Sequence, residues 1–218
     1  MSSIYSSNNK ERKITKKDIE IVVARYNENL NWLNHYFKFI TVYNKGNSRS
    51  CDKDIKLDNI GRESHTYLTH IIDNWDNLSE KTFFCQGYIN DHATWSIYKY
   101  LFNNRHLTIN LDCHQSTCYQ FWGHLIINDS KYLNSISYSP YTFGQWWDKY
   151  VQKPKPSPRS FKWGSGAIFS VSKSLIKENS LEYYQHLRES LRNCQNPEEG
   201  HYFERSWFYI FNQGVVSR

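Results

Sequence analysis

Short apolar runs alternate with segments of helical periodicity along the first ninety residues. Three runs, at residues 19–24, 39–46 and 82–87, are rich in β-branched and aromatic residues and lack a helical period, which is typical of buried strands. Between them, apolar residues recur at helical spacing over residues 30–37 and 68–75. Because strands joined through helices pair in parallel, we expect an α/β fold with a mostly parallel, Rossmann-like central sheet flanked by helices.

The rest of the chain has a less regular pattern. Residues 95–102 predict a helix, but the aromatic, Asn- and Ser-rich stretch up to residue 150 has no clean period, and residues 153–160 are typical of a proline-punctuated loop. A Gly-Ser-Gly sequence then leads into a further strand. Apolar stripes within residues 181–191 and 203–211 predict two closing helices.

Composition and charge narrow the class of protein. The first 18 residues are polar and strongly basic, so we expect a solvated arm ahead of one domain over residues 19–218. The net charge of +6 favours anionic partners. No apolar stretch approaches the ~18 residues of a membrane span, which favours a soluble, cytoplasmic protein without a transmembrane segment. Five scattered cysteines form no disulfide framework, and Cys113 and Cys118 lack the second pair expected of a zinc finger or ribbon.

Polar residues follow each strand of the predicted parallel unit. In an open parallel sheet, ligands bind beyond the carboxyl ends of the strands, where residues 25–28, 44–45 and 86–92 would emerge together. There the guanidinium of Arg25 could donate two hydrogen bonds to a phosphate. The polar side chains after it, Asn27 among them, equally suit contacts to a base or ribose and the capping of the next helix.

Arg62 lies in the first turn of the predicted second helix. Unpaired N–H groups and the helix dipole favour anions at this position, so Arg62 is a candidate phosphate ligand, worth roughly 1.5 to 3 kcal/mol. The alternative is a surface ion pair with Glu63 or Asp58, which would contribute about 0 to 1 kcal/mol.

Two further positions carry candidate chemistry. Asp91 and His92 end the third strand and could hold a divalent metal, although Asn-Asp sequences are also common in turns. Glu204 lies one residue from an apolar helical stripe, and half burial there would raise its pKa and suit it to general-base chemistry, unless it pairs with Arg205 or Arg188. By contrast, the carboxylates at 198–199 suit the positive end of a helix and are expected to be structural, with Asn196 as N-cap.

Taken in order, the motifs of this chain resemble the GT-A glycosyltransferase fold. The resemblance covers about residues 19–212 and is carried by VVARYNENLNWL, VYNKG, NIGRESHTYLTHII, FFCQG followed by DH, WGSGAIFSVSKSLI and FERSW. Together they are similar to the small glycosyltransferase-like domains of large DNA viruses and fungi. The DxD motif of that fold is reduced here to Asn90-Asp91-His92, which affects the expected metal site.

The resemblance implies an inverting transfer of a sugar from a UDP- or GDP-linked donor to a hydroxyl of a glycan or glycoprotein acceptor, in the host cytoplasm if the protein is viral. It implies Glu204 as general base and Mn²⁺ or Mg²⁺ on Asp91 and His92. The expected donor contacts are Ala24, Arg25, Tyr26, Asn27, Glu28, Lys45, Asn59, Arg62, Gln86, Gly87 and Asp91. The expected sugar or acceptor contacts are Trp163, Gly164, Ser165 and Trp146, with Trp147 a further candidate for stacking.

Two other classes of function fit parts of the same pattern. A metal-dependent phosphoesterase or nuclease would use Asp91, His92 and the basic surface, but the sequence lacks the extra acidic ligands of a two-metal site. A non-catalytic glycan-binding module would use the aromatic residues, which make up 17% of the chain, and would leave Asp91 as a turn residue. No specific nucleic-acid partner is expected.

Overall fold

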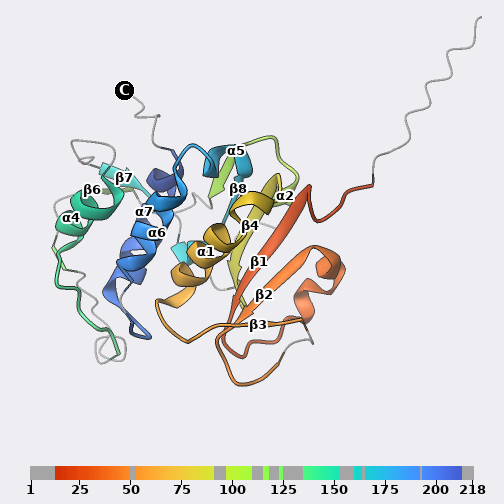
Figure 1. Cartoon of the computed structure of the whole chain (residues 1–218), viewed down its shortest axis with the longest axis horizontal. Helices are drawn as coiled ribbons and strands as arrows, with labels where there is room; N and C mark the ends of the chain where they lie inside the picture. The colour runs from red at the N-terminus through yellow and green to blue at the C-terminus, as the bar shows by residue number, and fades with distance from the viewer. Residues whose placement is uncertain are drawn as a thin grey trace, which may run out of the picture.

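A six-stranded sheet with the strand order β3-β2-β1-β4-β8-β5 forms the centre of the protein (Figure 1). The structure is a computed structural model, and it describes residues 13–49, 53–90, 97–109, 115–117, 123–124, 135–152, 160–163, 165–191 and 193–212. The strands of the sheet are β1 (Ile19–Arg25), β2 (Ile40–Asn44), β3 (Ile55–Lys56), β4 (Lys81–Gln86), β5 (Leu107–Ile109) and β8 (Phe169–Ser172). A separate antiparallel pair joins β6 (Gln115–Thr117) to β7 (Ser160–Lys162).

The parallel half of the sheet is built around β1. This strand pairs in parallel with β2 and β4, with Arg25 opposite Asn44 and Ala24 opposite Gln86. β8 runs antiparallel to both β4 and β5, so the sheet is mixed. The predicted α/β fold with a mostly parallel sheet is confirmed, and the register brings the carboxyl ends of β1, β2 and β4 to one edge.

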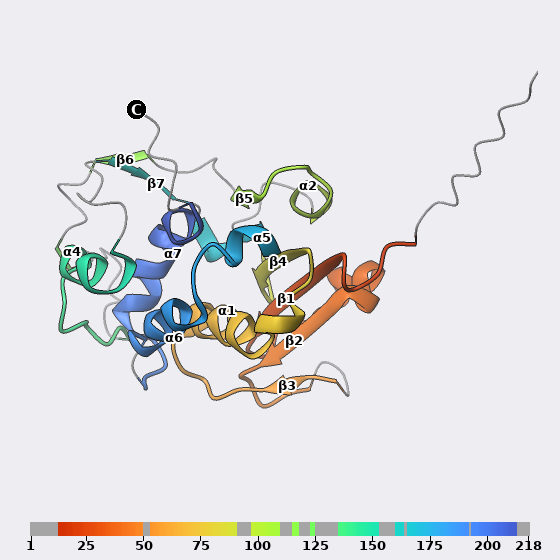
Figure 2. The same cartoon turned by 45° about the horizontal axis from the view of Figure 1, so that its top comes forward.

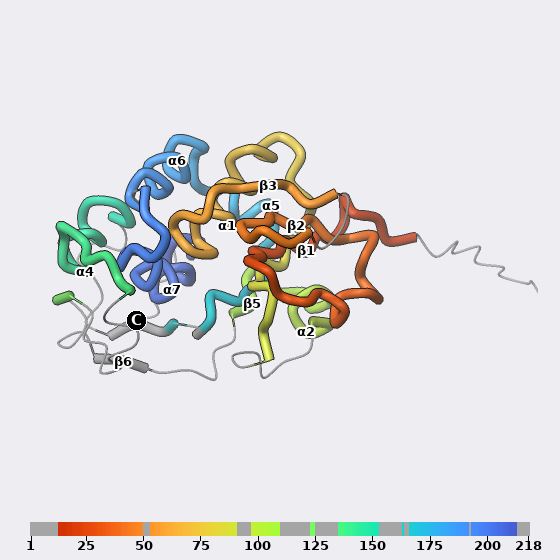
Figure 3. Tube along the Cα trace, turned by 90° about the horizontal axis from the view of Figure 1, so that it is seen from below, coloured from red at the N-terminus to blue at the C-terminus, as the bar shows by residue number. Residues whose placement is uncertain are grey.

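Helices cover both faces of the sheet in two unequal layers (Figure 2). Figure 3 shows α6 and α2 on opposite sides of the strands. The larger layer contains α1 (Arg62–Asp73), α4 (Phe143–Trp146), the π-helical η4 (Trp147–Val151), α5 (Lys173–Ile176), α6 (Leu181–Glu189) and α7 (Glu198–Phe211). The smaller layer contains η1 (Asn31–Phe39) and α2 (Ile97–Leu101), while η2 (Trp75–Asn77) and η5 (Ser165–Ala167) are single turns. None of the described helices is long and apolar enough to cross a membrane.

The side chains of β1 alternate between the two helical layers, so the strand is buried on both faces. Val22 and Ala24 pack into the core on the α1 side, whereas Ile21 and Val23 pack into the core on the η1 side. Because successive side chains of a strand point to opposite faces, Arg25 belongs to the η1 side.

Helix α1 begins in an unusual backbone conformation. Gly61 has a φ of 62° and Arg62 a φ of 52°, both in the left-handed region. For a residue with a side chain this region costs roughly 1–2 kcal/mol, so surrounding contacts must hold Arg62 in place. The helix starts at Arg62, as the sequence predicted.

The segment after β1 differs from its prediction. Residues 31–39 form a 3₁₀-helix rather than an α-helix, and its N-cap, Leu30, makes no side-chain capping bond. Asn27 does not cap it, because its Oδ1 accepts a hydrogen bond from the Ser48 N–H at 2.9 Å. The side chain of Asn27 therefore joins the loop after β1 to the loop after β2.

The start of α7 also departs from the sequence-based expectation. The helix begins at Glu198, Pro197 occupies the N-cap, and Asn196 does not cap it. The expected structural role of Glu198 is supported, since its buried carboxylate accepts a hydrogen bond from the Ser139 N–H at 2.8 Å.

The core between β8 and α7 allows a test of the packing. Phe169 is buried among aromatic rings, including those of Phe84 and Trp207. Phe169→Ala should lower the free energy of unfolding by about 3–5 kcal/mol, because it removes buried area and leaves a cavity. Phe37→Ala, at a side chain that is 62% exposed, should change it by less than about 0.5 kcal/mol. Urea denaturation measures both, and equal losses in the two variants would contradict the packing described.

Candidate functional site

A cavity of about 440 Å³ opens at the carboxyl ends of β1, β2 and β4. Glu63 and residues 195–196 also line it, so α1 and the segment before α7 close it from the sides. Of the predicted donor contacts, those that line the cavity are Ala24, Arg25, Tyr26, Glu28, Lys45, Asn59, Arg62 and Gln86. Ser135 lines it as well, so the structure brings together polar residues from six separate segments of the chain.

Lys45 places a buried positive charge in the wall of this cavity. Its ammonium donates hydrogen bonds to the carbonyl oxygens of Ile60, at 2.6 Å, and of Arg62. No carboxylate of the described residues lies within 4 Å of it. Burial lowers the pKa of Lys45 to about 8, and the nearby charge of Glu63 opposes that shift. Lys45 thus fastens the end of β2 to the start of α1 and supplies a cation at neutral pH.

The side chain of Arg62 lies in a cradle formed by the first turns of α7. Its Nη1 donates to Asn196 Oδ1 at 3.1 Å and lies 3.4 Å from His201 Nε2. Burial, Arg62 and Arg205 lower the pKa of His201 to about 3, so the imidazole is neutral and can accept this bond. A Cβ on Gly200 would lie 2.8 Å from Arg62 Cδ, so only glycine leaves room for the arginine at this position.

Glu204 lies one helical turn after Gly200 on α7. Its side chain is 18% exposed, its Oε1 accepts a hydrogen bond from the Gly166 N–H at 2.5 Å, and its Oε2 lies 3.8 Å from Arg205 Nη1. Burial raises the pKa of Glu204; Glu63 raises it further, whereas the charges of Arg205 and Arg62 and the Gly166 bond lower it. A carboxylate with a raised pKa is suited to accept a proton.

Gln86 links this carboxylate to the cavity. Its Nε2 donates to the carbonyl oxygen of Gly166 at 3.0 Å, and the N–H of the same glycine bonds Glu204. Gln86 also lines the cavity at the end of β4. Arg62 and Gln86 therefore line the same cavity, whereas Glu204 lies outside its lining and is connected to Gln86 through Gly166.

Two residues predicted to contact the donor sugar nucleotide, Arg25 and Glu28, form hydrogen bonds within the protein. The guanidinium of Arg25 donates to the carbonyl oxygens of Glu28, at 2.9 Å, and of Ser48, at 2.5 Å. The Oε2 of Glu28 accepts from the N–H of Tyr26 at 2.6 Å, and a Cβ on Gly87 would lie 2.6 Å from that oxygen. These side chains hold the loop after β1, and Arg25 and Glu28 also line the cavity that Arg62 lines.

The aromatic residues predicted to contact a sugar differ in how deeply they are buried. Trp146 is fully buried in the core, as is Trp147, so the expected stacking of either ring on a sugar is wrong. Trp163 is half-buried, with the Arg205 guanidinium 4.6 Å from its ring centroid, which ties it to the residue after Glu204. Gly164 lies outside the described residues, as does the side chain of Ser165.

The predicted metal ligands Asp91 and His92 lie outside the described residues. Within the described part of the chain, no three His, Cys, Asp or Glu side chains form a group that could hold a metal ion. The divalent metal on Asp91 therefore stays a prediction.

Several residues of the site escaped the sequence analysis. The sequence does not identify Asn196, Gly200 and His201 as contacts of Arg62. The ion pair with Glu63, the alternative role of Arg62, is present, with Arg62 Nε 3.6 Å from Glu63 Oε2. A spacing signal existed for two of the positions, because residues 200 and 204 lie four apart on one face of α7; Asn196 precedes the helix. What the sequence did not specify is that this face crosses the start of α1, more than 130 residues earlier in the chain.

Comparison with protein families matches residues 21–218 to the family described as Protein of unknown function (DUF3431). No curated protein and no solved structure gives a match. The description of the matching family names no activity.

Gly200→Ala tests the cradle around Arg62. Its Cβ should displace the arginine and weaken binding of inorganic pyrophosphate by about tenfold or more, or about 1.4 kcal/mol. Stability should not fall by more than about 1 kcal/mol, since alanine favours the helix. Gly123→Ala, whose Cβ meets no atom within 4 Å, is the matched control. Titration calorimetry measures the affinity, and unchanged binding in Gly200→Ala would contradict the cradle.

Lys45 should make stability depend on pH. Its folded pKa of about 8 lies below the ordinary value of 10.5, so the unfolded chain binds more protons between these limits and stability increases as pH rises. Relative to Lys45→Met, the free energy of unfolding of the wild type should rise by up to about 3 kcal/mol as the pH rises from 8 to 10.5. It should fall by the same amount as the pH returns from 10.5 to 8. Urea denaturation across this range measures the difference, and a flat difference would show that Lys45 is not desolvated.

Proposed function

Because the chain belongs to the DUF3431 family, whose function is unknown, we propose a function from the site: a glycosyltransferase that moves a sugar from a nucleotide-diphosphate sugar to a hydroxyl of a glycan acceptor. One observation carries the proposal. Glu204, a carboxylate with a raised pKa, does not line the cavity but is connected to it by two hydrogen bonds, through Gly166 and Gln86, and the cavity itself is lined by the cations Arg62 and Lys45. This is the combination of general base and anion site that the transfer requires.

The anion site would hold the diphosphate of the donor. Arg62 lies at the start of α1, where unpaired backbone N–H groups favour negative charge, and it is pre-positioned by α7. Lys45 adds a positive charge that no carboxylate of the described residues neutralises within 4 Å. Both charges would stabilise the negative charge that develops on the leaving nucleoside diphosphate. The exposed ring of Tyr26, also in the cavity wall, is suited to contact the base.

Glu204 would act on the acceptor. Its Oε1 is held by the Gly166 N–H at 2.5 Å, whereas its Oε2 has the longer contact of 3.8 Å to Arg205 Nη1, so Oε2 would receive the proton. As the acceptor oxygen bonds to the anomeric carbon, the bond from that carbon to the phosphate oxygen breaks, the electron pair leaves with the diphosphate, and the acceptor proton passes to Glu204. Attack opposite the leaving group inverts the configuration at the anomeric carbon.

A divalent metal would fit this chemistry by neutralising the diphosphate, but its expected ligands Asp91 and His92 lie outside the described residues. No step is therefore assigned to it. Arg62 and Lys45 alone provide the cationic contacts on which the proposal rests.

Glu204→Gln is the direct test. The variant should lose transfer activity by a factor of about 10² or more, because the amide cannot take the proton, while a UDP- or GDP-sugar still raises its melting temperature. The raised pKa of Glu204 means that its ionised form costs stability at neutral pH, so the variant should be at least as stable as the wild type. Glu80→Gln, at an exposed carboxylate paired with Lys173, is the matched control.

The outcomes separate the three candidate classes. A transferase loses turnover in Glu204→Gln and keeps donor binding. A phosphoesterase would release phosphate without any acceptor, and a glycan-binding module would be indifferent to the substitution. A panel of nucleotide sugars that gives no thermal shift in the wild type would refute the donor site itself.

A further inference from the structure

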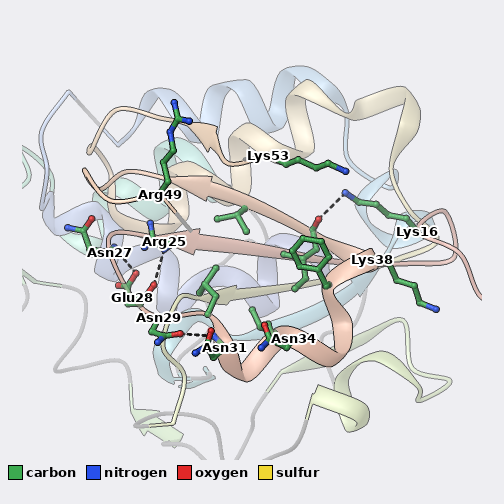
Figure 4. A pocket seen from close by; sticks show the side chains of 15 residues that line it. Lys16, Arg25, Asn27, Glu28, Asn29, Asn31, Asn34, Lys38, Arg49 and Lys53 are labelled. Atoms are coloured by element: carbon green, nitrogen blue, oxygen red, sulfur yellow. Dashed lines mark hydrogen bonds between the residues drawn. The ribbon is translucent and has the colours of Figure 1, made fainter. Parts of the chain in front are cut away.

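A second and larger hollow lies against the face of β2 that η1 leaves partly uncovered (Figure 4). Its volume is about 720 Å³, which is in the range of small-molecule sites. Apolar side chains from the sheet and from η1 line it, among them Leu33, Ile40 and Val42. Phe37 stands at the same wall with 62% of its surface exposed. Five of its fifteen lining residues are apolar, and this part of the wall favours a ligand with an apolar body.

Arg25 gives the hollow a buried positive charge. The residue is only 4% exposed. Its guanidinium donates hydrogen bonds to the backbone carbonyl oxygens of Glu28 and Ser48 and to the hydroxyl of Ser48. Among the described residues, no carboxylate lies within 4 Å of that guanidinium. A buried charge without a counter-charge is costly, so an anion in the hollow would relieve a cost that the folded protein carries.

All but one of the other charged residues that line the hollow are positive. Arg49 and Lys53, in the loop after β2, and Lys38, at the end of η1, line its rim, and the charged ends of Arg49 and Lys38 point outward (Figure 4). Glu28 is the single acid among its described lining residues, and its carboxylate is bonded to backbone N–H groups of the loop. The net potential in the hollow therefore favours a negatively charged ligand.

We propose that this hollow is a second ligand site, which binds an anion attached to an apolar body. The apolar wall takes the body, and Arg25 with the rim cations takes the charge. The site lies on the other face of the sheet from the cavity that Arg62 lines, because strand parity places the Arg25 side chain on the η1 face whereas α1 and α7 cover the other. The two cavities share Arg25 and Glu28, which lie between them. The inference holds whether or not the protein is a glycosyltransferase.

Titration calorimetry with 1-naphthyl phosphate tests the site. The probe should bind at least about tenfold more tightly than 1-naphthol, which lacks the charge, and than inorganic phosphate, which lacks the apolar body. The double substitution Arg49→Glu with Lys53→Glu should weaken the probe by about tenfold or more. Phe37→Ala should weaken it also. Arg25 itself is kept, because it holds the loop after β1.

Two controls make the result specific. Arg105→Glu reverses an exposed charge outside the hollow and should leave the affinity unchanged. Gly200→Ala, which alters the cavity beside Arg62, should also leave it unchanged, which separates this site from the proposed donor site. The proposal is overturned if the probe does not bind, if the rim substitutions have no effect, or if Gly200→Ala weakens the probe as much as they do.

Discussion

Burial of β1 on both faces is the constraint on which the architecture and both cavities depend. A strand in this position must pair with neighbours on each side and alternate its side chains between two helical layers, which β1 does with Val22 and Ala24 on one face and Ile21 and Val23 on the other. Its parallel neighbours then end where it ends. The loop after Arg25 consequently has one cavity on each side, and both draw residues from it.

That loop is held by its own charged side chains. The carboxylate of Glu28 accepts hydrogen bonds from the backbone N–H groups of Tyr26 and Asn27, and the guanidinium of Arg25 donates one to the carbonyl oxygen of Glu28. The carboxylate also fills the space that a side chain on Gly87 would need, which brings the end of β4 against the loop. A ligand that contacts Arg25 and a ligand that contacts Tyr26 would therefore meet the same short segment from opposite faces.

The sequence predicted those features whose signals are local. Apolar runs located the central strands, and the start of a helical stripe located Arg62 at the beginning of α1. The direction of Arg25 was also predictable, since Ile19, Ile21 and Val23 share its parity and form the η1-side core. Other contacts depend on how distant elements cross. The fit of Arg62 over Gly200, and the burial of Trp146 behind α7, follow from the packing of helices that no periodicity specifies.

The charges near the cavity couple anion binding at Arg62 to the pKa of Glu204. Glu63 lies 3.6 Å from Arg62 Nε and raises the pKa of Glu204, whereas Arg62 lowers it. An anion bound at Arg62 would offset the influence of the arginine and add negative charge near Glu204, so the pKa of that carboxyl would rise further. In the proposed transfer, the charge on the diphosphate grows as the acceptor proton moves, and the affinity of Glu204 for the proton would grow with it. Donor binding and base strength would then increase together, because both act through the charge of Arg62.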